Sequence, residues 1–392
     1  MQNIVGQIAS KENFYMRPRE IRRINQNLAA GANLQIAAPR RVGKSSILYY
    51  FLDNPEKGFV HLYFQVESAR SKNEFYRKIY KEIIKSDAVG TGKKFFEQLN
   101  ATTNDFLKRL KGITIAGSGI DFHDAEEIDY EEELLNLLRG LDLGRDRLVL
   151  MIDEFPEVIL NIVEDNEGKA TEAKKFLQSN RELRNNVNLK DKVQFIYTGS
   201  NSLNLTVGNL DSSSLINDLA AIPVLPLKEE EAQEMLISIL NTYKFGLKTE
   251  IADYIIARVE WMIPFYFQLI IHEIINDIAP GEDITKEVVD KAFDASLEQR
   301  NDHHFEHYVK RLKRVFTEGE QDFIKIFLCQ LAANEKLDRN QVLNLATGLI
   351  SEEQTRRLLE ALKYDGYIID LTNAEYKFNS PILKNWWKNH EC

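Results

Sequence analysis

Two short segments carry side chains whose types and spacing suit phosphate chemistry. The first is Gly43-Lys44-Ser45-Ser46, which follows the apolar run NLQIAA and precedes the helix-like run ILYYFL. A glycine-containing turn between a strand and a helix surrounds phosphates with backbone N–H groups and the positive end of the helix dipole. Lys44 would place its charge on the β- and γ-phosphates, and Ser45 would ligate Mg²⁺. The segment therefore predicts a phosphate loop.

The second segment is Asp153-Glu154, at the end of the apolar run LVLMIDE. A buried strand that ends in two acids places both carboxylates at the carboxyl edge of a sheet, beside a phosphate loop. Asp153 would hold Mg²⁺, directly or through water, and Glu154 would polarise the water that attacks the γ-phosphate. A strand that simply ends in exposed acids is common, but the pairing with Gly-Lys-Ser favours the catalytic interpretation.

A third strand end, in VQFIYTGSNSL, carries Thr198 and Ser200. A hydroxyl there would contact the γ-phosphate or the attacking water. Turn chemistry explains a Thr-Gly-Ser-Asn sequence equally well, so the residues alone leave both interpretations open.

The composition indicates a soluble globular protein of more than one domain. The chain has 392 residues, of which 44% are hydrophobic and 28% charged, and a single core stops growing below this length. No apolar run is long enough to cross a bilayer, and the N-terminus lacks the pattern of a secretory signal. Cys329 and Cys392 are expected to be free thiols in a reducing compartment, which predicts a cytoplasmic protein.

The charge disfavours DNA binding without excluding it. The formal net charge is -10, whereas sequence-independent DNA affinity comes from clustered Lys and Arg. Residues 311–392 hold twelve Lys/Arg and twelve Asp/Glu, so the C-terminal segment is neutral.

The order of the patterns predicts an α/β protein, a P-loop NTPase core with a parallel sheet, followed by a helical lid domain and a C-terminal winged helix. Four strand-like runs, NLQIAA, GFVHLYFQV, RLVLMIDE and KVQFIYTGS, alternate with amphipathic helices. Residues 1–225 are the expected core, in which 89–130 form an insertion with a hairpin around Gly117 and Gly119. Residues 226–305 are the expected small helical domain. Residues 306–392 are the expected winged helix, with three helices and two strands around Asn373.

Two further patterns are weaker. Gly90-Thr91-Gly92-Lys93 looks like part of a phosphate loop, but it follows a charged helix end rather than a strand, so a solvated loop is the better interpretation. His303, His304 and His307 place two imidazoles one helical turn apart, although no carboxylate or cysteine motif accompanies them to complete a metal site.

Taken together, these residues resemble the archaeal-type ATPases of the STAND class, which are relatives of AAA+ and origin-recognition ATPases. The loop APRRVGKSS is similar to that family's G-P-R-R-x-G-K-[ST]-[ST], and NFYMRPRE is similar to its F-x-x-R-x-x-E entry segment, which lies near the adenine. DEFPEVI and YTGSNSL resemble the Walker B and sensor strands, WMIPF the lid's G-x-P element, and KFNSPILKNWW the close of the winged helix. The resemblance implies a site for ATP and Mg²⁺. Its nucleotide-binding residues would be Phe14, Arg17, Ala38, Pro39, Arg40, Arg41, Val42, Gly43, Lys44, Ser45, Ser46 and Pro264, its metal ligands Ser45 and Asp153, and its catalytic residues Lys44, Glu154, Thr198 and Ser200.

The sequence departs from this family at three places. Ala38 replaces the first loop glycine, which is tolerable if its φ is negative. Trp261 or Met262 replaces the glycine before Pro264. Where the family shows a Gly-Arg pair before Pro-Leu, this chain has Asn217 and Asp218, so hydrolysis is expected to be slow or to need a partner's arginine. Arg40 or Arg41 acting across an oligomer interface is one conceivable source.

Three functions fit these features. The favoured hypothesis is an ATP-binding switch in which nucleotide changes how the winged helix is held, with a protein partner or a second copy of the chain as its target. The alternatives are a DNA-binding regulator or loader that works through the winged helix, and an interaction scaffold with structural ATP.

Overall fold

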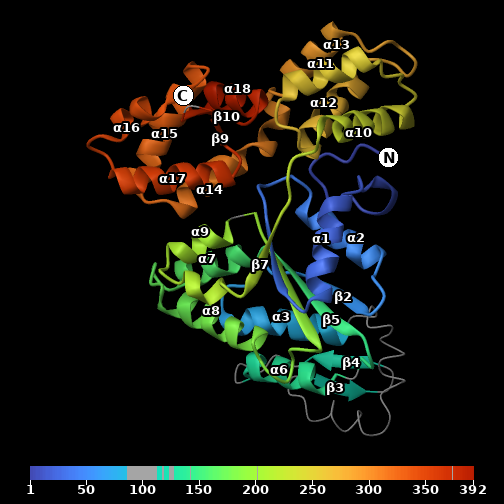
Figure 1. Cartoon of the computed structure of the whole chain (residues 1–392), viewed down its shortest axis with the longest axis vertical. Helices are drawn as coiled ribbons and strands as arrows, with labels where there is room; N and C mark the ends of the chain where they lie inside the picture. The colour runs from blue at the N-terminus through green and yellow to red at the C-terminus, as the bar shows by residue number, and fades with distance from the viewer. Residues whose placement is uncertain (86–112, 117–118, 123–127, 142, 201, 373) are drawn as a thin grey trace. The chain divides into compact units, whose positions relative to one another are not determined.

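The computed structural model shows a chain that divides into two compact units (Figure 1). The sheet unit comprises Arg17–Ala37 and Lys44–Pro223, and the C-terminal unit comprises Met1–Met16, Ala38–Gly43 and Val224–Cys392. The residues that the structure describes are 1–85, 113–116, 119–122, 128–141, 143–200, 202–372 and 374–392.

A five-stranded parallel sheet forms the centre of the sheet unit, with strand order β2-β5-β6-β1-β7. Because every strand runs the same way, the carboxyl ends of all five lie at one edge of the sheet, where α/β proteins bind their ligands. The strands are β1 (Asn33–Ala37), β2 (Phe59–Gln65), β5 (Arg147–Asp153), β6 (Val193–Thr198) and β7 (Leu219–Pro223).

Strand β7 is not among the four strands expected from the sequence. It consists of LAAIP and pairs with β1 from Asn33↔Leu219 to Ala37↔Pro223. The strand is short and ends in a proline, which a sheet tolerates at its edge but not in its centre. Both properties weaken the strand pattern in the sequence.

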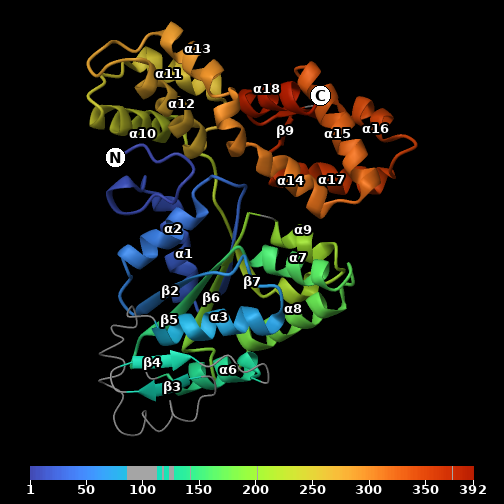
Figure 2. The ribbon, with the colours of Figure 1, turned by 180° about the vertical axis from the view of Figure 1, so that it is seen from behind.

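Helices cover both faces of this sheet (Figures 1 and 2). Helices α1 and α2 pack on one face, and α3, α6, α7 and α8 pack on the other. Their bounds, with those of the remaining helices of the unit, are α1 (Pro18–Ala29), α2 (Lys44–Asp53), α3 (Lys72–Lys85), α6 (Tyr130–Gly140), α7 (Phe155–Asp165), α8 (Thr171–Arg184), α9 (Leu203–Gly208) and the 3-10 helix η3 (Ser213–Ile216). None of the helices in the described ranges is both long and apolar enough to span a bilayer.

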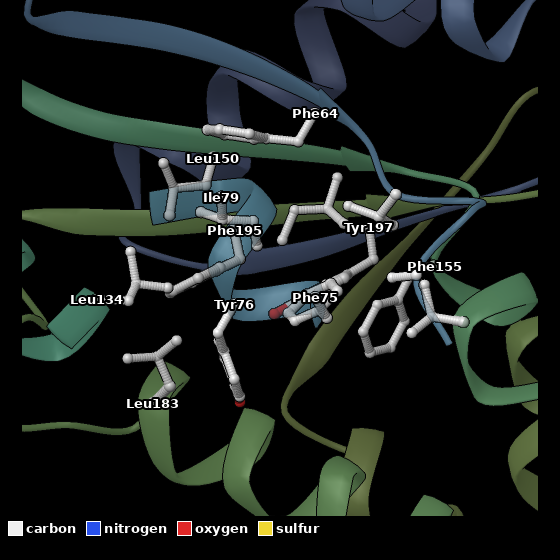
Figure 3. Close-up of a cluster of buried hydrophobic side chains, with 14 of the residues drawn as sticks. Phe64, Phe75, Tyr76, Ile79, Leu134, Leu150, Phe155, Leu183, Phe195 and Tyr197 are labelled. Carbon is white, nitrogen blue, oxygen red and sulfur yellow. The ribbon is translucent and has the colours of Figure 1, made fainter. Parts of the chain in front are cut away.

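Aromatic side chains fill much of the core on the α3 face (Figure 3). Phe75 of α3 makes edge contacts with Phe155 and Phe176, with ring centroids 5.7 and 5.0 Å apart. Phe155, the first residue of α7, also lies 4.6 Å from the ring of Tyr197 on β6. Since Phe155 directly follows the acidic pair, this packing fixes the point at which the chain leaves β5.

A pair of antiparallel strands is present where the sequence predicted a hairpin. Strands β3 (Ile113–Ala116) and β4 (Gly119–Phe122) pair antiparallel, with Ala116 opposite Gly119. Gly117, and the Gly90-Lys93 segment that resembles part of a phosphate loop, lie outside the described residues.

The C-terminal unit is mainly helical. Between Glu306 and Tyr364 the chain forms four helices rather than the expected three, since α14 precedes the others. The elements of the unit are the 3-10 helices η1 (Lys11–Asn13) and η4 (Gln299–His304), and helices α10 (Glu229–Thr242), α11 (Thr249–Val259), α12 (Pro264–Asp277), α13 (Lys286–Ala295), α14 (Glu306–Val315), α15 (Glu318–Ala333), α16 (Arg339–Ala346), α17 (Glu352–Tyr364) and α18 (Pro381–His390).

A small sheet accompanies the last helices. The two expected strands, β9 (Ile368–Leu371) and β10 (Glu375–Phe378), pair antiparallel, and the two-residue strand β8 (Leu337–Asp338) pairs with β10 on its other side. Asn373, expected at the turn, is outside the described residues.

The expectation of two free thiols is wrong. Cys329 of α15 and Cys392, the last residue of the sequence, form a disulfide, with Cα atoms 5.5 Å apart. Helix α18 packs along α15 and so brings the two positions together. The spacing of the two cysteines in the sequence does not show that α18 packs back against α15.

His61 on β2 makes the sheet unit sensitive to acid. Its side chain is buried against Phe51, with ring centroids 5.3 Å apart, and among the described residues neither ring nitrogen has a hydrogen-bond partner. Burial lowers the pKa of His61 to about 4. The unfolded chain therefore binds this proton first, and stability falls as the pH drops from about 6.5 towards 4.

We expect His61→Phe, which keeps the aromatic contact but cannot titrate, to remove this part of the acid dependence. Between pH 7 and 4.5 the wild type should lose up to about 3 kcal/mol more of its unfolding free energy than the variant. Urea unfolding at a series of pH values measures the difference, and parallel curves would contradict the assignment.

Candidate nucleotide-binding site

Asp153, the last residue of β5, accepts hydrogen bonds from three directions. Ser45 donates from its Oγ to Oδ2 at 2.7 Å, and Tyr63 donates from its phenolic hydroxyl to the same oxygen at 2.9 Å. The backbone N–H of Glu154 donates to Oδ1 at 3.1 Å. The carboxylate predicted to bind metal thus lies directly against the serine predicted to share that metal.

The alternation of side chains along the strands explains this meeting. In β5, Leu148, Leu150 and Ile152 enter the core on the α3 face, so Asp153 points to the opposite face, where α2 begins at Lys44. By the same rule Tyr63 shares the face of His61, which contacts α2. Tyr49 of α2 packs edge-on against Tyr63, with ring centroids 4.9 Å apart.

The environment of Asp153 disfavours its charge. Burial raises its pKa, the neighbouring Glu154 raises it further, and the hydrogen bonds from Ser45 and Tyr63, together with Lys44, oppose that rise. A bound cation would relieve this cost, because it favours the charged form of the carboxylate.

Glu154 is fixed by both its backbone and its side chain. It adopts the left-handed conformation with φ 61° and ψ 34°, which non-glycine residues rarely do. Its carboxylate accepts a hydrogen bond from Ser200 N at 2.8 Å and another from Ser200 Oγ at 2.5 Å. The residue predicted to orient water and one of the two predicted sensor residues are therefore in direct contact.

Thr198 ends β6 on the same sheet face as Asp153, since Phe195 and Tyr197 enter the opposite core. Its side chain is 3% exposed, and Oγ1 has no hydrogen-bond partner among the described residues. A buried hydroxyl without a partner is costly, and a ligand atom at this edge would satisfy it.

Lys44 and Ser46 begin α2 and are both buried. Six of the predicted residues stand at the carboxyl ends of strands of one sheet or soon after them, as the sequence predicted. They are Lys44, Ser45, Asp153, Glu154, Thr198 and Ser200.

The six loop residues before Lys44 belong to the C-terminal unit. Arg41 and Gly43 have positive φ values of 65° and 100°, and Ala38 does not have a positive φ. The condition under which alanine is tolerated at the first position is therefore met. Left-handed residues of this kind occur in nests, concave backbone arrangements in which successive N–H groups turn towards one point and bind an anion.

The other residues assigned by resemblance are divided between the units. Arg17 precedes α1 in the sheet unit, where its Nε lies 3.8 Å from Glu20 Oε2. Phe14 follows η1, and Pro264 is the first residue of α12, both in the C-terminal unit.

Trp261, one of the two candidates for the position where the resemblance leads one to expect a glycine, has a packing role. A Cβ on Gly366, which has φ 82°, would lie 2.2 Å from the Trp261 ring. The indole thus occupies the space that any side chain at position 366 would need. Met262 contributes its backbone carbonyl, which accepts a hydrogen bond from Leu227 N at 2.7 Å.

Asn217 and Asp218 stand where the resemblance leads one to expect an arginine, and arginines of α8 contact both. Arg184 donates from Nε and Nη2 to the two Asp218 oxygens at 2.8 Å each, and from Nη1 to Asn180 at 2.7 Å. Arg181 donates to Asn217 at 3.2 Å. Arg184 is fully buried, so it serves the packing of α8 against the segment before β7.

The histidine cluster does not form a metal site. His304 packs edge-on against Phe265, with ring centroids 5.4 Å apart, and His307 lies against Tyr308 at 4.2 Å. Within the described ranges, no group of three or more His, Cys, Asp or Glu residues is placed to hold a metal ion.

Ser45 and Asp153 nonetheless suit Mg²⁺. A hydroxyl and a carboxylate are the oxygen ligands that this ion prefers, and it usually takes only one or two of them from protein and the rest from water and phosphate. Their contact at 2.7 Å and the raised pKa of Asp153 fit a site that a cation would complete.

Comparison with solved structures identifies the fold. The Walker-type ATPase of Pyrococcus abyssi superposes with a TM-score of 0.64 at 15% identity, covering 98% of this chain and 99% of that one. The ORC2 protein of Aeropyrum pernix gives a TM-score of 0.54 at 12% identity, covering 97% and 96%. The fold is that of a P-loop NTPase. The predicted α/β P-loop core with a parallel sheet and the predicted resemblance to archaeal-type P-loop ATPases are thereby confirmed at the level of the fold. No protein-family model matches the chain, and no curated protein matches it in sequence.

Sequence reasoning missed Tyr63. A tyrosine in a strand is an ordinary core residue, and only the pairing of β2 with β5 brings its hydroxyl to Asp153. The contact could have been found by aligning GFVHLYFQV with RLVLMIDE as paired strands, because the alternation of side chains then places Tyr63 on the same face as Asp153.

The Arg184–Asp218 pair leads to a stability prediction. Removing Arg184 leaves the partly buried Asp218 carboxylate without the two hydrogen bonds that the guanidinium donates, so we expect Arg184→Met to lower the unfolding free energy by about 1.5–3 kcal/mol. Arg181→Met, on the same helix but with one hydrogen bond to a neutral amide, should cost less than about 1.5 kcal/mol. Urea unfolding compares the two, and equal losses would contradict a special role for Arg184.

Proposed function

We propose that the chain is a Mg²⁺-dependent P-loop ATPase that works as a nucleotide-controlled conformational switch. The observation that carries this proposal is the hydrogen bond from Ser45 to Asp153. It joins the start of α2 to the end of β5 at the sheet edge, and in the loop that precedes α2 in the chain Arg41 and Gly43 have positive φ values. The fold shared with a Walker-type ATPase supports the same conclusion.

Each residue would have a defined task. The loop N–H groups and Lys44 bind the β- and γ-phosphates. Ser45 and Asp153 would hold Mg²⁺, which neutralises phosphate charge. Glu154 orients the attacking water, and Ser200 sets the direction of that carboxylate, since it donates two hydrogen bonds to it. Thr198, whose Oγ1 has no hydrogen-bond partner within the described part of the chain, offers this hydroxyl to the γ-phosphate or to the water.

Hydrolysis is proposed to be slow until a partner contributes. Asn217 and Asp218 are bound to arginines of α8, and the buried Arg184 side chain is held by both oxygens of Asp218. An arginine supplied by a partner protein or by a second copy of the chain would stabilise the transition-state charge. Of the two loop arginines considered for that task, Arg41 is already stacked on Phe265 of its own chain.

The output of the switch is proposed to lie in the C-terminal unit. We assign residues 226–305 to a small helical domain and residues 306–392 to a winged helix, since α15, α16 and α17 precede the paired strands β9 and β10. This order is consistent with the STAND class. Because residues 311–392 carry no net charge, a protein partner fits this domain better than DNA.

Lys44→Ala tests the phosphate loop. Loss of the ammonium group should weaken ATP binding by roughly 10- to 100-fold, because a charge-assisted contact to phosphate is lost. Calorimetry with ATP and Mg²⁺ measures this, and Lys57→Ala, an exposed lysine beyond the same helix, is the matched control. Undiminished affinity in Lys44→Ala would remove the assignment.

Glu154→Gln separates binding from hydrolysis. The amide can still accept from Ser200 but is a much poorer base, so ATP affinity should hold while turnover falls by about 10²- to 10⁴-fold. The matched control is Glu167→Gln, which should behave as wild type. Glu167 is an exposed acid just after the end of α7, the helix that Glu154 precedes. If wild type binds ATP but hydrolyses it no faster than Glu154→Gln, with and without a partner, the scaffold interpretation is correct.

A further inference from the structure

Arg41 occupies an unusual backbone position for an arginine. It lies in the phosphate loop, two residues before Gly43, with φ 65°. The nest needs this left-handed conformation, which glycine adopts freely and an arginine adopts only at a cost. Some other contact must therefore keep the loop in the conformation that binds phosphate.

That contact is a stacking interaction with Phe265. The Arg41 guanidinium carbon lies 3.8 Å from the centre of the Phe265 ring, which is well within the range of a cation–π interaction. Phe265 is the second residue of α12 and is 4% exposed, so its ring is held by the packing of that helix. The geometry joins the loop to the start of α12 through side chains of the C-terminal unit alone.

The ring is the main partner of this guanidinium. Burial lowers the pKa of Arg41 to about 10, and its Nη1 is buried with no hydrogen-bond partner among the described residues. Cation–π attraction grows when the cation is shielded from water, so these conditions strengthen the stacking.

The neighbouring titratable groups leave this contact undisturbed near neutral pH. Burial, and then the charge of Arg41, lower the pKa values of His304 and His307, so both imidazoles stay neutral. Tyr266 and Tyr308 also surround the guanidinium, and Arg40 repels it. Arg311, which lies near His307, is paired with Asp365.

We propose that Arg41 is a positioning residue: by stacking on Phe265 it holds the phosphate loop in its anion-binding conformation before nucleotide arrives. The inference rests on the proposed ATP binding. Because coupling between two sites is reciprocal, bound nucleotide in turn holds α12 to the loop, and this gives the switch its connection to the C-terminal unit.

The test compares ATP affinity and turnover in variants of the full-length chain. Arg41→Ala and Phe265→Leu should each raise the Kd for ATP by roughly tenfold, the order expected for a desolvated cation–π contact. The double variant should be no weaker than either single variant, since one interaction is lost in all three. At saturating ATP, kcat should stay near the wild-type value, because neither residue touches the reacting atoms.

Two controls separate positioning from loss of fold. Phe265→Tyr keeps an aromatic face and should restore most of the affinity. The matched pair is Arg258 and Phe293, which make the same type of contact at 4.2 Å on α11 and α13. Arg258→Ala and Phe293→Leu should leave the Kd for ATP unchanged, even where they lower the melting temperature as much as Arg41→Ala and Phe265→Leu do.

The outcomes are distinct. If wild type binds no ATP, the proposed function fails and this inference fails with it. If wild type binds ATP while Phe265→Leu does so equally well, or the two single effects simply add, the ATPase assignment stands and Arg41 does not position the loop.

Discussion

The sheet unit depends on one constraint, which is that a buried carboxylate must be satisfied at the end of a buried strand. Asp153 follows six residues of β5, five of which are fully or nearly inaccessible to water. An isolated charge there would be prohibitive, so the surrounding elements supply donors. Ser45 comes from the helix beyond the loop, Tyr63 from the neighbouring strand and Glu154 from the turn itself. Three features of the fold therefore serve to bring a donor to Asp153. They are the start of α2, the register of β2 on β5 and the left-handed turn at Glu154.

The sequence was sufficient to locate the residues of this edge. The Gly-Lys-Ser turn, the acids after LVLMI and the hydroxyls after VQFIY each follow an apolar run, and parallel strands place such positions together. The sequence could not show which other group each of these side chains contacts. That Ser200 engages Glu154, or that Tyr63 reaches Asp153, depends on register between strands that lie far apart in the chain.

The errors have physical causes of the same kind. Strand β7 is short and ends in proline, so local preference hides a strand that pairing with β1 stabilises. The bonding of Cys329 to Cys392 arises from the packing of α18 on α15, which no local pattern records. Trp261 or Met262 stands where the resemblance leads one to expect a glycine, and the sequence does not show that the Trp261 ring fills space left by Gly366. Local chemistry could be predicted from the sequence, whereas compensation between distant positions could not.

The contact of Trp261 with Gly366 has a consequence for which residues each position accepts. A Cβ at position 366 would lie only 2.2 Å from the indole, so a side chain there would displace Trp261, whereas a smaller residue at position 261 would leave a cavity. Space alone would not admit another residue at position 366, because its φ of 82° is strained for any residue that carries a Cβ. Glycine at position 366 is therefore favoured for two separate reasons, its left-handed backbone and the indole against it, while position 261 can become smaller at the cost of packing.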